Sequence, residues 1–171
     1  LDDLRTVNEQ LQESEAQYRG IVEASSDAVI VVDMDGHILE ANPAARELYG
    51  YAPGALRALE PRDLVHPDDH ARFDDFVDRI PQAADLKTEF KNVHRDGTPF
   101  DVEVRLSTFE YRGRPHLLNM IRDISERKRM ERTMQERMKE LTCLYAVSRD
   151  VQAGLSLEEL CRRVVTYVRP A

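Results

Sequence analysis

The sequence contains no tryptophan, only two cysteines and no long apolar run. Cys143 and Cys161 lack the spacing of zinc ligands and are too few for a disulfide framework. No stretch reaches the roughly 18 consecutive apolar residues that a membrane span needs. Residues 1–25 carry acids and amides where a signal peptide has its apolar core. These absences predict a cytoplasmic chain without membrane contact.

The excess of basic charge that nucleic-acid binding requires is also missing. The 171 residues include 24 Lys and Arg against 32 Asp and Glu, for a net charge of −8, and an acidic surface repels phosphate backbones. The densest basic run, residues 127–129, is flanked by Glu126 and Glu131, which is typical of a solvated helix face. We therefore expect no nucleic-acid partner.

Catalytic and metal-binding groups are not assembled in the sequence either. No histidine follows His116, so the C-terminal helix lacks a phosphoacceptor histidine, and no glycine-rich loop is present to hold phosphate. The densest His and Asp cluster, residues 66–70, is interrupted by Pro67, and Asp68 is placed to cap a helix. We therefore predict no catalytic residue, no metal site and no enzyme activity.

Residues 1–24 predict one amphipathic helix. Apolar side chains recur at alternating spacings of three and four, with Ser14 as the break, and this predicted dimer seam comprises Leu4, Val7, Leu11, Tyr18 and Ile21. A seam of this length favours pairing with a second copy of the chain. The alternative is a single helix lying on the domain's own core.

A hairpin and a short helix are expected next. The β-branched run 28–32 and residues 37–41 are typical of two strands joined at Gly36, whose backbone suits a tight turn. Asn42 and Pro43 then have the character of an N-cap and a first helical residue. They predict a short helix directly after the hairpin.

The following residues predict short turns, a longer helix and three strands. Prolines limit residues 52–67 to short helical turns, whereas residues 68–80 place apolar side chains on one helix face. Strict alternation follows, clearest over residues 101–106, with tight turns at 95–97 and 112–114. The expected fold class is α+β, with a five-stranded antiparallel sheet and helices on one face.

The alternation also predicts which side chains face the helices and line an interior ligand pocket. This set is mostly apolar and comprises Ile30, Val32, Phe73, Phe76, Val77, Phe90, Asn92, Val102, Val104, Asn119 and Ile121. Buried amides need hydrogen-bond partners. Asn92 and Asn119 are therefore expected to bind a small polar ligand or, alternatively, each other, the backbone or water.

The last predicted strand, residues 117–121, passes into a charged helix without an intervening glycine or proline. Ser125 is placed to cap this helix by accepting hydrogen bonds from its first N–H groups. Because no flexible spacer separates the two elements, a movement of the strand is transmitted to the helix. The predicted signal junction includes Asp123, Ile124, Ser125 and Glu126.

Over roughly residues 20–129 the sequence resembles a PAS domain, the sensory module of bacterial signalling proteins. The matching pieces occur in the family's order: Asp33-Met34-Asp35-Gly36, Gly50-Tyr51, Leu64-Val65-His66-Pro67-Asp68-Asp69, Arg95-Asp96-Gly97-Thr98 and Asp123-Ile124-Ser125-Glu126-Arg127-Lys128. The resemblance implies a sheet whose helical side encloses a small cavity, and regulation through the flanking helices. It also implies a contact between Asp123 and Arg95, which adds Arg95 to the junction. An exposed pair of little energetic consequence is the alternative.

The resemblance also bears on cofactors. Flavin-binding light sensors of the family use a helical cysteine and amides on three strands, but residues 43–81 contain no cysteine, and Val102 and Ile121 occupy two amide positions. Haem-binding relatives place a histidine where this sequence has Asp74, and His70 lies one turn earlier. We therefore predict no cofactor, and the small-molecule ligand stays unknown.

From Glu126 onward the sequence predicts a long helix with a second dimer seam. This seam is broken by Arg137 and Ser148 and comprises Met130, Met134, Leu141 and Leu144. Residues 141–160 resemble the first helices of a GAF domain, which the remaining chain is too short to complete. The predicted organisation is a helix over 1–24, a PAS domain over 25–124, a coiled-coil linker over 125–154 and a truncated GAF-like start over 155–171.

These expectations describe a regulatory fragment of a signal-transduction protein of the histidine kinase or cyclic-dinucleotide enzyme type. Its expected partners are a second copy, bound through the flanking helices, and the output domains of the parent chain. Its predicted role is to pass a conformational signal from the PAS core to the C-terminal helix. One alternative is a ligand-free structural dimerisation module, and another is a haem or flavin redox sensor.

Overall fold

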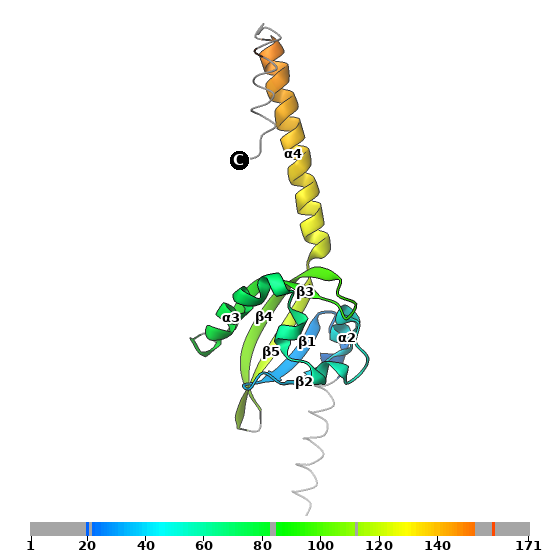
Figure 1. Ribbon diagram of the computed structural model, residues 1–171, viewed down its shortest axis with the longest axis vertical. Helices are drawn as coiled ribbons and strands as arrows, with labels where there is room; N and C mark the ends of the chain where they lie inside the picture. Colours follow the sequence, from blue (N-terminus) through cyan, green and yellow to red (C-terminus); the bar gives the residue numbers. More distant parts are fainter. Residues whose placement is uncertain (1–19, 21, 83–84, 112, 153–158, 160–171) are drawn as a thin grey trace, which may run out of the picture. The chain divides into compact units, whose positions relative to one another are not determined.

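The computed structural model describes residues 20, 22–82, 85–111, 113–152 and 159 (Figure 1). The predicted N-terminal dimer seam lies outside these residues and comprises Leu4, Val7, Leu11, Tyr18 and Ile21. The predicted GAF-like start over 155–171 is described only at residue 159. Both stay predictions.

A five-stranded antiparallel sheet forms the centre of the domain. Its strands are β1 (Ala28–Asp33), β2 (Ile38–Ala41), β3 (Asp85–Val93), β4 (Pro99–Tyr111) and β5 (Arg114–Asp123). Their spatial order is β2-β1-β5-β4-β3, so the first and the last of these five strands in the sequence are hydrogen-bonded neighbours within the sheet. The predicted α+β fold class is confirmed.

The segments between β2 and β3 are helical and cover one face of the sheet (Figure 1). They are α2 (Pro43–Tyr49), η1 (Ala55–Ala58), η2 (Pro61–Leu64), η3 (Pro67–Asp69), α3 (His70–Asp78) and η4 (Ile80–Gln82). Asn42 caps α2 by accepting a hydrogen bond from Ala45 N, and Gly50 ends the helix at a φ of 74°. The predicted hairpin, cap and short turns are thus present.

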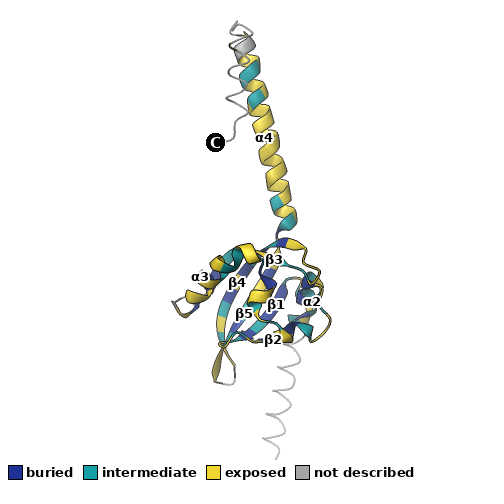
Figure 2. Cartoon of the chain, in the orientation of Figure 1, coloured by how far each residue is buried: buried dark blue, intermediate teal, exposed yellow. Residues whose placement is uncertain are grey.

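Apolar side chains of the sheet and of these helices form the core, and the buried residues are dark blue in Figure 2. On β4, Val102, Val104 and Leu106 are buried, whereas Arg105 between two of them is exposed. The alternation read from the sequence therefore gives the correct inward face of this strand.

The prediction that Val77 faces the interior is wrong, because its side chain is 41% exposed. The α3 neighbour Phe76 is buried, and the rings of Phe73 and Phe76 lie 6.0 and 5.5 Å from that of Phe90. These two rings occupy the part of α3 that meets the sheet. Val77 lies at the edge of the apolar stripe and remains outside the contact.

The chain divides into two compact units, the first ending at Ser125 and the second beginning at Glu126. Helix α4 (Ser125–Gln152) begins at the last residue of the first unit, and its residues 126–152, with residue 159, are the described part of the second. Among the described helices, none is both long and apolar enough to cross a membrane.

Candidate signalling junction

The junction after β5 is bonded to the backbone of Asp101 on β4. Ile124 is 4% exposed, and its N–H donates to Asp101 O at 2.9 Å. The Ser125 hydroxyl accepts from Asp101 N at 3.0 Å and donates to Asp101 O at 3.4 Å. These three hydrogen bonds, which we call the Asp101 clasp, attach the first residues after β5 to the neighbouring strand.

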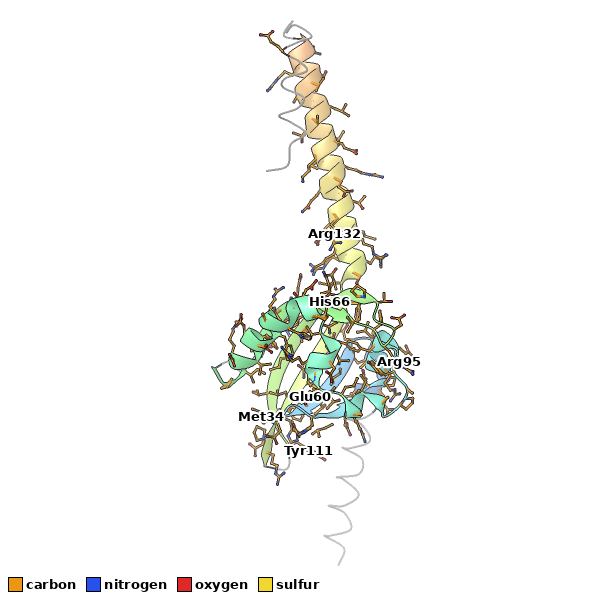
Figure 3. The ribbon with its side chains drawn as sticks, viewed as in Figure 1. Met34, Glu60, His66, Arg95, Tyr111 and Arg132 are labelled. Carbon is orange, nitrogen blue, oxygen red and sulfur yellow. The ribbon has the colours of Figure 1, made fainter. Side chains whose placement is uncertain are left out.

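The predicted contact between Asp123 and Arg95 is wrong. Among the described residues no ion pair joins them. The Asp123 carboxylate accepts instead from Ser125 N at 2.8 Å. Arg95 lies beside α2 (Figure 3), where its N–H donates to Tyr49 O at 2.9 Å. The Arg95 backbone thus attaches the β3-β4 turn to α2, whereas the Asp123 side chain binds the backbone two residues further along its own chain.

Asn42 organises the start of the domain from a buried position, with 5% of its surface exposed. Its Oδ1 accepts from Val29 N and Ala45 N, both at 2.9 Å. Its Nδ2 donates to Val22 O at 3.0 Å and to Asp27 O at 3.1 Å. One side chain therefore joins the helical residues 22–24, β1 and α2.

Asp27 and Arg122 form a bidentate ion pair between the start of β1 and the end of β5. Nε and Nη2 of Arg122 lie 3.0 and 2.7 Å from the two carboxylate oxygens. The hydrogen bond from Arg122 lowers the pKa of Asp27 against a smaller opposing effect of burial. The pair forms because Ala28 and Ile121 are register partners.

Among the residues that the structure describes, Asn92 and Tyr49 form a polar pair in the interior. Nδ2 of Asn92 donates to the Tyr49 hydroxyl at 2.6 Å, and burial raises the pKa of that hydroxyl far above its ordinary value. Oδ1 of Asn92 is buried without a hydrogen-bond partner. Asn119 instead donates to Ile30 O at 3.4 Å, so the two interior amides do not bind each other.

Most of the predicted ligand-pocket residues are packed into the apolar core. Its members include Ile30, Val32, Phe76, Phe90, Val102, Val104 and Ile121. Phe73 is partly buried against them, and Asn92 is 3% exposed. Whether a ligand occupies this interior stays a prediction.

A cavity of about 930 Å³ lies along the edge strand β2, between the outer face of the sheet and residues of α2 and η1. Val29, Val31 and Leu39 contribute to its wall, together with the rings of Phe109, Tyr111 and His116. Tyr111 is the last residue of β4 (Figure 3). Sequence reasoning missed this cavity because the alternation assigned these residues to the solvated face.

The turn between β1 and β2 gathers Asp33, Asp35 and His37, whose ligand atoms lie within 4.8 Å of one another. The Asp33 carboxylate already accepts from Asp35 N at 3.0 Å and from His37 N at 2.8 Å. These hydrogen bonds explain why the three residues lie close together: they stabilise the β1-β2 turn. The absence of a metal site stays a prediction.

The seam predicted on α4 is exposed within its unit. Met130 and Leu144 are 63% and 65% exposed, and Met134 and Leu141 are exposed as well. Two further apolar side chains that the heptad assignment missed, Met138 and Tyr145, are also exposed. The α4 surface therefore has an apolar stripe available to a partner.

The fold and the junction define an α+β domain whose last residues, Ile124 and Ser125, are bonded to the sheet. A model of the PAS fold matches residues 16–124, and the chain therefore belongs to the PAS family. PAS domains are regulatory sensor modules. This finding confirms the resemblance given above; the coiled-coil linker and the GAF-like start stay predictions.

Two curated relatives are sensor proteins. The sensor protein FixL of Bradyrhizobium diazoefficiens is 25% identical over 86% of this chain and 30% of its own length. The sensor histidine kinase TmoS of Ectopseudomonas mendocina is 27% identical over 88% of this chain and 16% of its own length. The chain thus spans less than a third of either relative.

A solved structure with the same fold is the PAS domain of a two-component sensor histidine kinase. It is 19% identical and covers 66% of this chain and 98% of its own, with a TM-score of 0.58. At this identity the similarity establishes the fold.

Several of the junction's anchoring residues were missed by sequence reasoning. Asp27, Arg122 and Asp101 have ordinary positions at strand ends, and Asn42 was identified only as a helix cap. The opposite charges of Asp27, directly before β1, and Arg122, near the end of β5, were the one feature of the sequence that could have indicated the pair. That signal is readable only when β1 and β5 are known to be neighbours.

Proposed function

We propose that this chain is the sensory and dimerisation module of a multidomain signal-transduction protein, and that it passes a conformational change from the PAS core to α4. The observation that carries this proposal is the Asp101 clasp. β4 is bonded to β3 on one side and to β5 on the other. A shift of β4 against β5 therefore acts on Ile124 and Ser125 without an intervening loop.

The unpartnered Oδ1 of Asn92 supports the sensory part of the proposal. A buried oxygen without a hydrogen bond costs about 1–3 kcal/mol, so a small ligand that donates a hydrogen bond gains affinity there. Asn92 pairs with Phe100 across the β3-β4 hairpin. A ligand at Asn92 would thus act on the strand that carries the clasp.

The output and the partners of the module are part of the same proposal. TmoS is named a sensor histidine kinase, which supports a kinase-type output, and a cyclic-dinucleotide enzyme is the second option. The exposed apolar stripe of α4 supports pairing with a second copy. The low cysteine content supports a cytoplasmic location.

The proposal is tested by combining a substitution in the apolar core with a substitution in the Asp101 clasp. Val104→Ala removes methyl groups from a buried β4 side chain that faces Ile121 on β5. In a Cys143→Ser, Cys161→Ser background, we expect it to shift the distances between spin labels placed at position 139 (Lys139→Cys) of the two copies. Ser125→Ala should weaken this response, because it removes both hydroxyl contacts with Asp101.

Ser125→Thr is the matched control, because it keeps the hydroxyl and should retain the response. If Val104→Ala unfolds the domain, Val104→Ile replaces it, because this substitution enlarges the side chain at the same core position. An equal response with and without the Ser125 hydroxyl would show that the clasp does not carry the signal. No response in any variant would reject signal passing altogether.

The two rival functions predict different observations. A ligand-free structural dimerisation module would show no bound small molecule in a native mass spectrum and no response to Val104→Ala. A haem or flavin redox sensor would absorb visible light. The residues fit it poorly, because His70 Nε2 lies 3.0 Å from Val65 O and residues 43–81 contain no cysteine.

A further inference from the structure

Hydrogen bonds at the start of the domain connect residue 22 to the end of β5, where the outgoing residues begin. Val22 O belongs to the helical residues 22–24, and it accepts a long backbone hydrogen bond from Ser25 N at 3.4 Å. It accepts from Asn42 Nδ2 at 3.0 Å. The same nitrogen donates to Asp27 O at 3.1 Å, so one amide group joins the incoming helix end to Asp27.

The side chain of Asp27 continues this connection to β5. Its two carboxylate oxygens meet Arg122 at 3.0 and 2.7 Å, and the Asp27 side chain is only 22% exposed. A bidentate pair with one partly buried partner fixes direction as well as distance. Arg122 directly precedes Asp123, whose carboxylate holds Ser125 N at 2.8 Å.

We propose that the domain is also a relay, in which a change at the helical residues 22–24 reaches α4 through Asn42, Asp27 and Arg122 without passing through Asn92 or the apolar core. The relay adds a second input to the proposed function. Its input is a change at residues 22–24, whereas the input described above is a ligand at Asn92.

The structure explains why this connection is short. β1 begins where β5 ends, because Ala28 pairs with Ile121 in the register of the two strands. The incoming and outgoing parts of the chain therefore meet at one edge of the core. Asn42 is 5% exposed and has all four of its hydrogen bonds within the protein, so it cannot lose Val22 O without leaving a buried donor unsatisfied.

The relay is tested by loosening the incoming helix end and measuring amide exchange at the exit. Val22→Gly favours an open helix end. We expect it to raise the exchange rates of the Ile124 and Ser125 amides by about tenfold, the size of a typical coupling between sites. With Arg122→Gln present, the same substitution should change these rates by less than about twofold.

Asp74→Asn is the matched control, because Asp74 also forms a bidentate pair with an arginine, Arg62, at 3.1 and 3.1 Å. That pair has no connection to residues 22–27, so the response to Val22→Gly should persist. The amide of Phe90 serves as an internal reference, since an equal increase there indicates global unfolding. In that case Asn42→Asp, which keeps the two accepted bonds and removes the two donated ones, replaces Val22→Gly.

Two results would overturn the relay. One is an unchanged exchange rate at Ile124 and Ser125 after the incoming end is loosened. The other is a response of equal size with and without the Arg122 side chain. Neither result affects the Val104→Ala test of the proposed function, because that change starts in the interior and acts through Asp101.

Discussion

Asn42 and Asn92 are both buried amides, but their surroundings give them different roles. Asn42 satisfies its donors and acceptors with four backbone groups, and its position is therefore fixed by the fold. Asn92 has one partner, the Tyr49 hydroxyl, and an Oδ1 without any. The unsatisfied oxygen makes Asn92 the interior residue with capacity to bind something more.

Tyr49→Phe should lower the free energy of unfolding by about 1–3 kcal/mol, because Nδ2 of Asn92 then loses its acceptor inside the core. Urea denaturation measures this change. Adding Asn92→Leu should restore part of the loss, since replacing both polar partners by apolar groups removes the unsatisfied atoms. A double variant less stable than Tyr49→Phe alone would contradict this account of the pair.

At the scale of elements, the pairing of β1 with β5 determines how the domain connects to the rest of its chain. These strands are adjacent although they are the first and the last of the sheet. Their register brings Asp27 and Arg122 together at one end. The clasp at Asp101 then adds β4, so three strands act on the residues that precede Glu126.

The Asp27–Arg122 pair should make stability depend on acidity in a defined direction. The folded pKa of Asp27 lies below its ordinary value of 3.8, so the pair stabilises the protein above that pH and loses its effect as pH falls through the folded pKa. The stability difference between the wild type and Asp27→Asn should be constant from about pH 7 to about pH 5 and shrink toward about pH 2. Chemical denaturation across this range measures it.

Asp74→Asn is the comparison variant, because both partners of its pair are about half exposed and solvent screens them. We expect a smaller effect of this substitution at every pH. A difference for Asp27→Asn that stayed undiminished in acid would mean that the charge of Asp27 does not stabilise the fold.

At the scale of the whole molecule, the α4 stripe makes a second copy the expected partner. Met134 is 70% and Tyr145 76% exposed, and a helix with an unpaired apolar stripe is stabilised by packing against another helix. Arg137, which lies between Met134 and Leu141 in the sequence, interrupts the heptad seam. A charged residue in a seam weakens pairing and restricts its geometry.

Light scattering should therefore find a dimer for the intact chain. We expect the chain lacking residues 1–24 to stay dimeric through α4, and Met134→Glu with Leu141→Glu to produce monomers, because these charges enter the stripe. Arg132→Glu with Lys139→Glu places the same number of acids on the opposite side of the helix and should leave the dimer intact. Monomers in the intact chain would refute both predicted seams.

The sequence was most informative where local chemistry decides the structure. Asn42-Pro43 predicts the start of α2, Gly36 and Gly97 predict turns, and the alternation on β4 predicts its buried face. These features depend on residues within a few positions of one another. Val77 was mispredicted because a helix stripe has an angular width, and only the packed sheet determines how much of it is covered.

The sequence by itself therefore determined the fold class, the order of the elements and the absence of a flexible spacer before α4. Only the tertiary structure decided the partners of the junction: Asp101 for Ile124 and Ser125, Ser125 for Asp123, and Arg122 for Asp27. The physical reason is that these contacts depend on which strands are neighbours and in which register they pair. Residues 95 positions apart in the chain, such as Asp27 and Arg122, become neighbours only through that register.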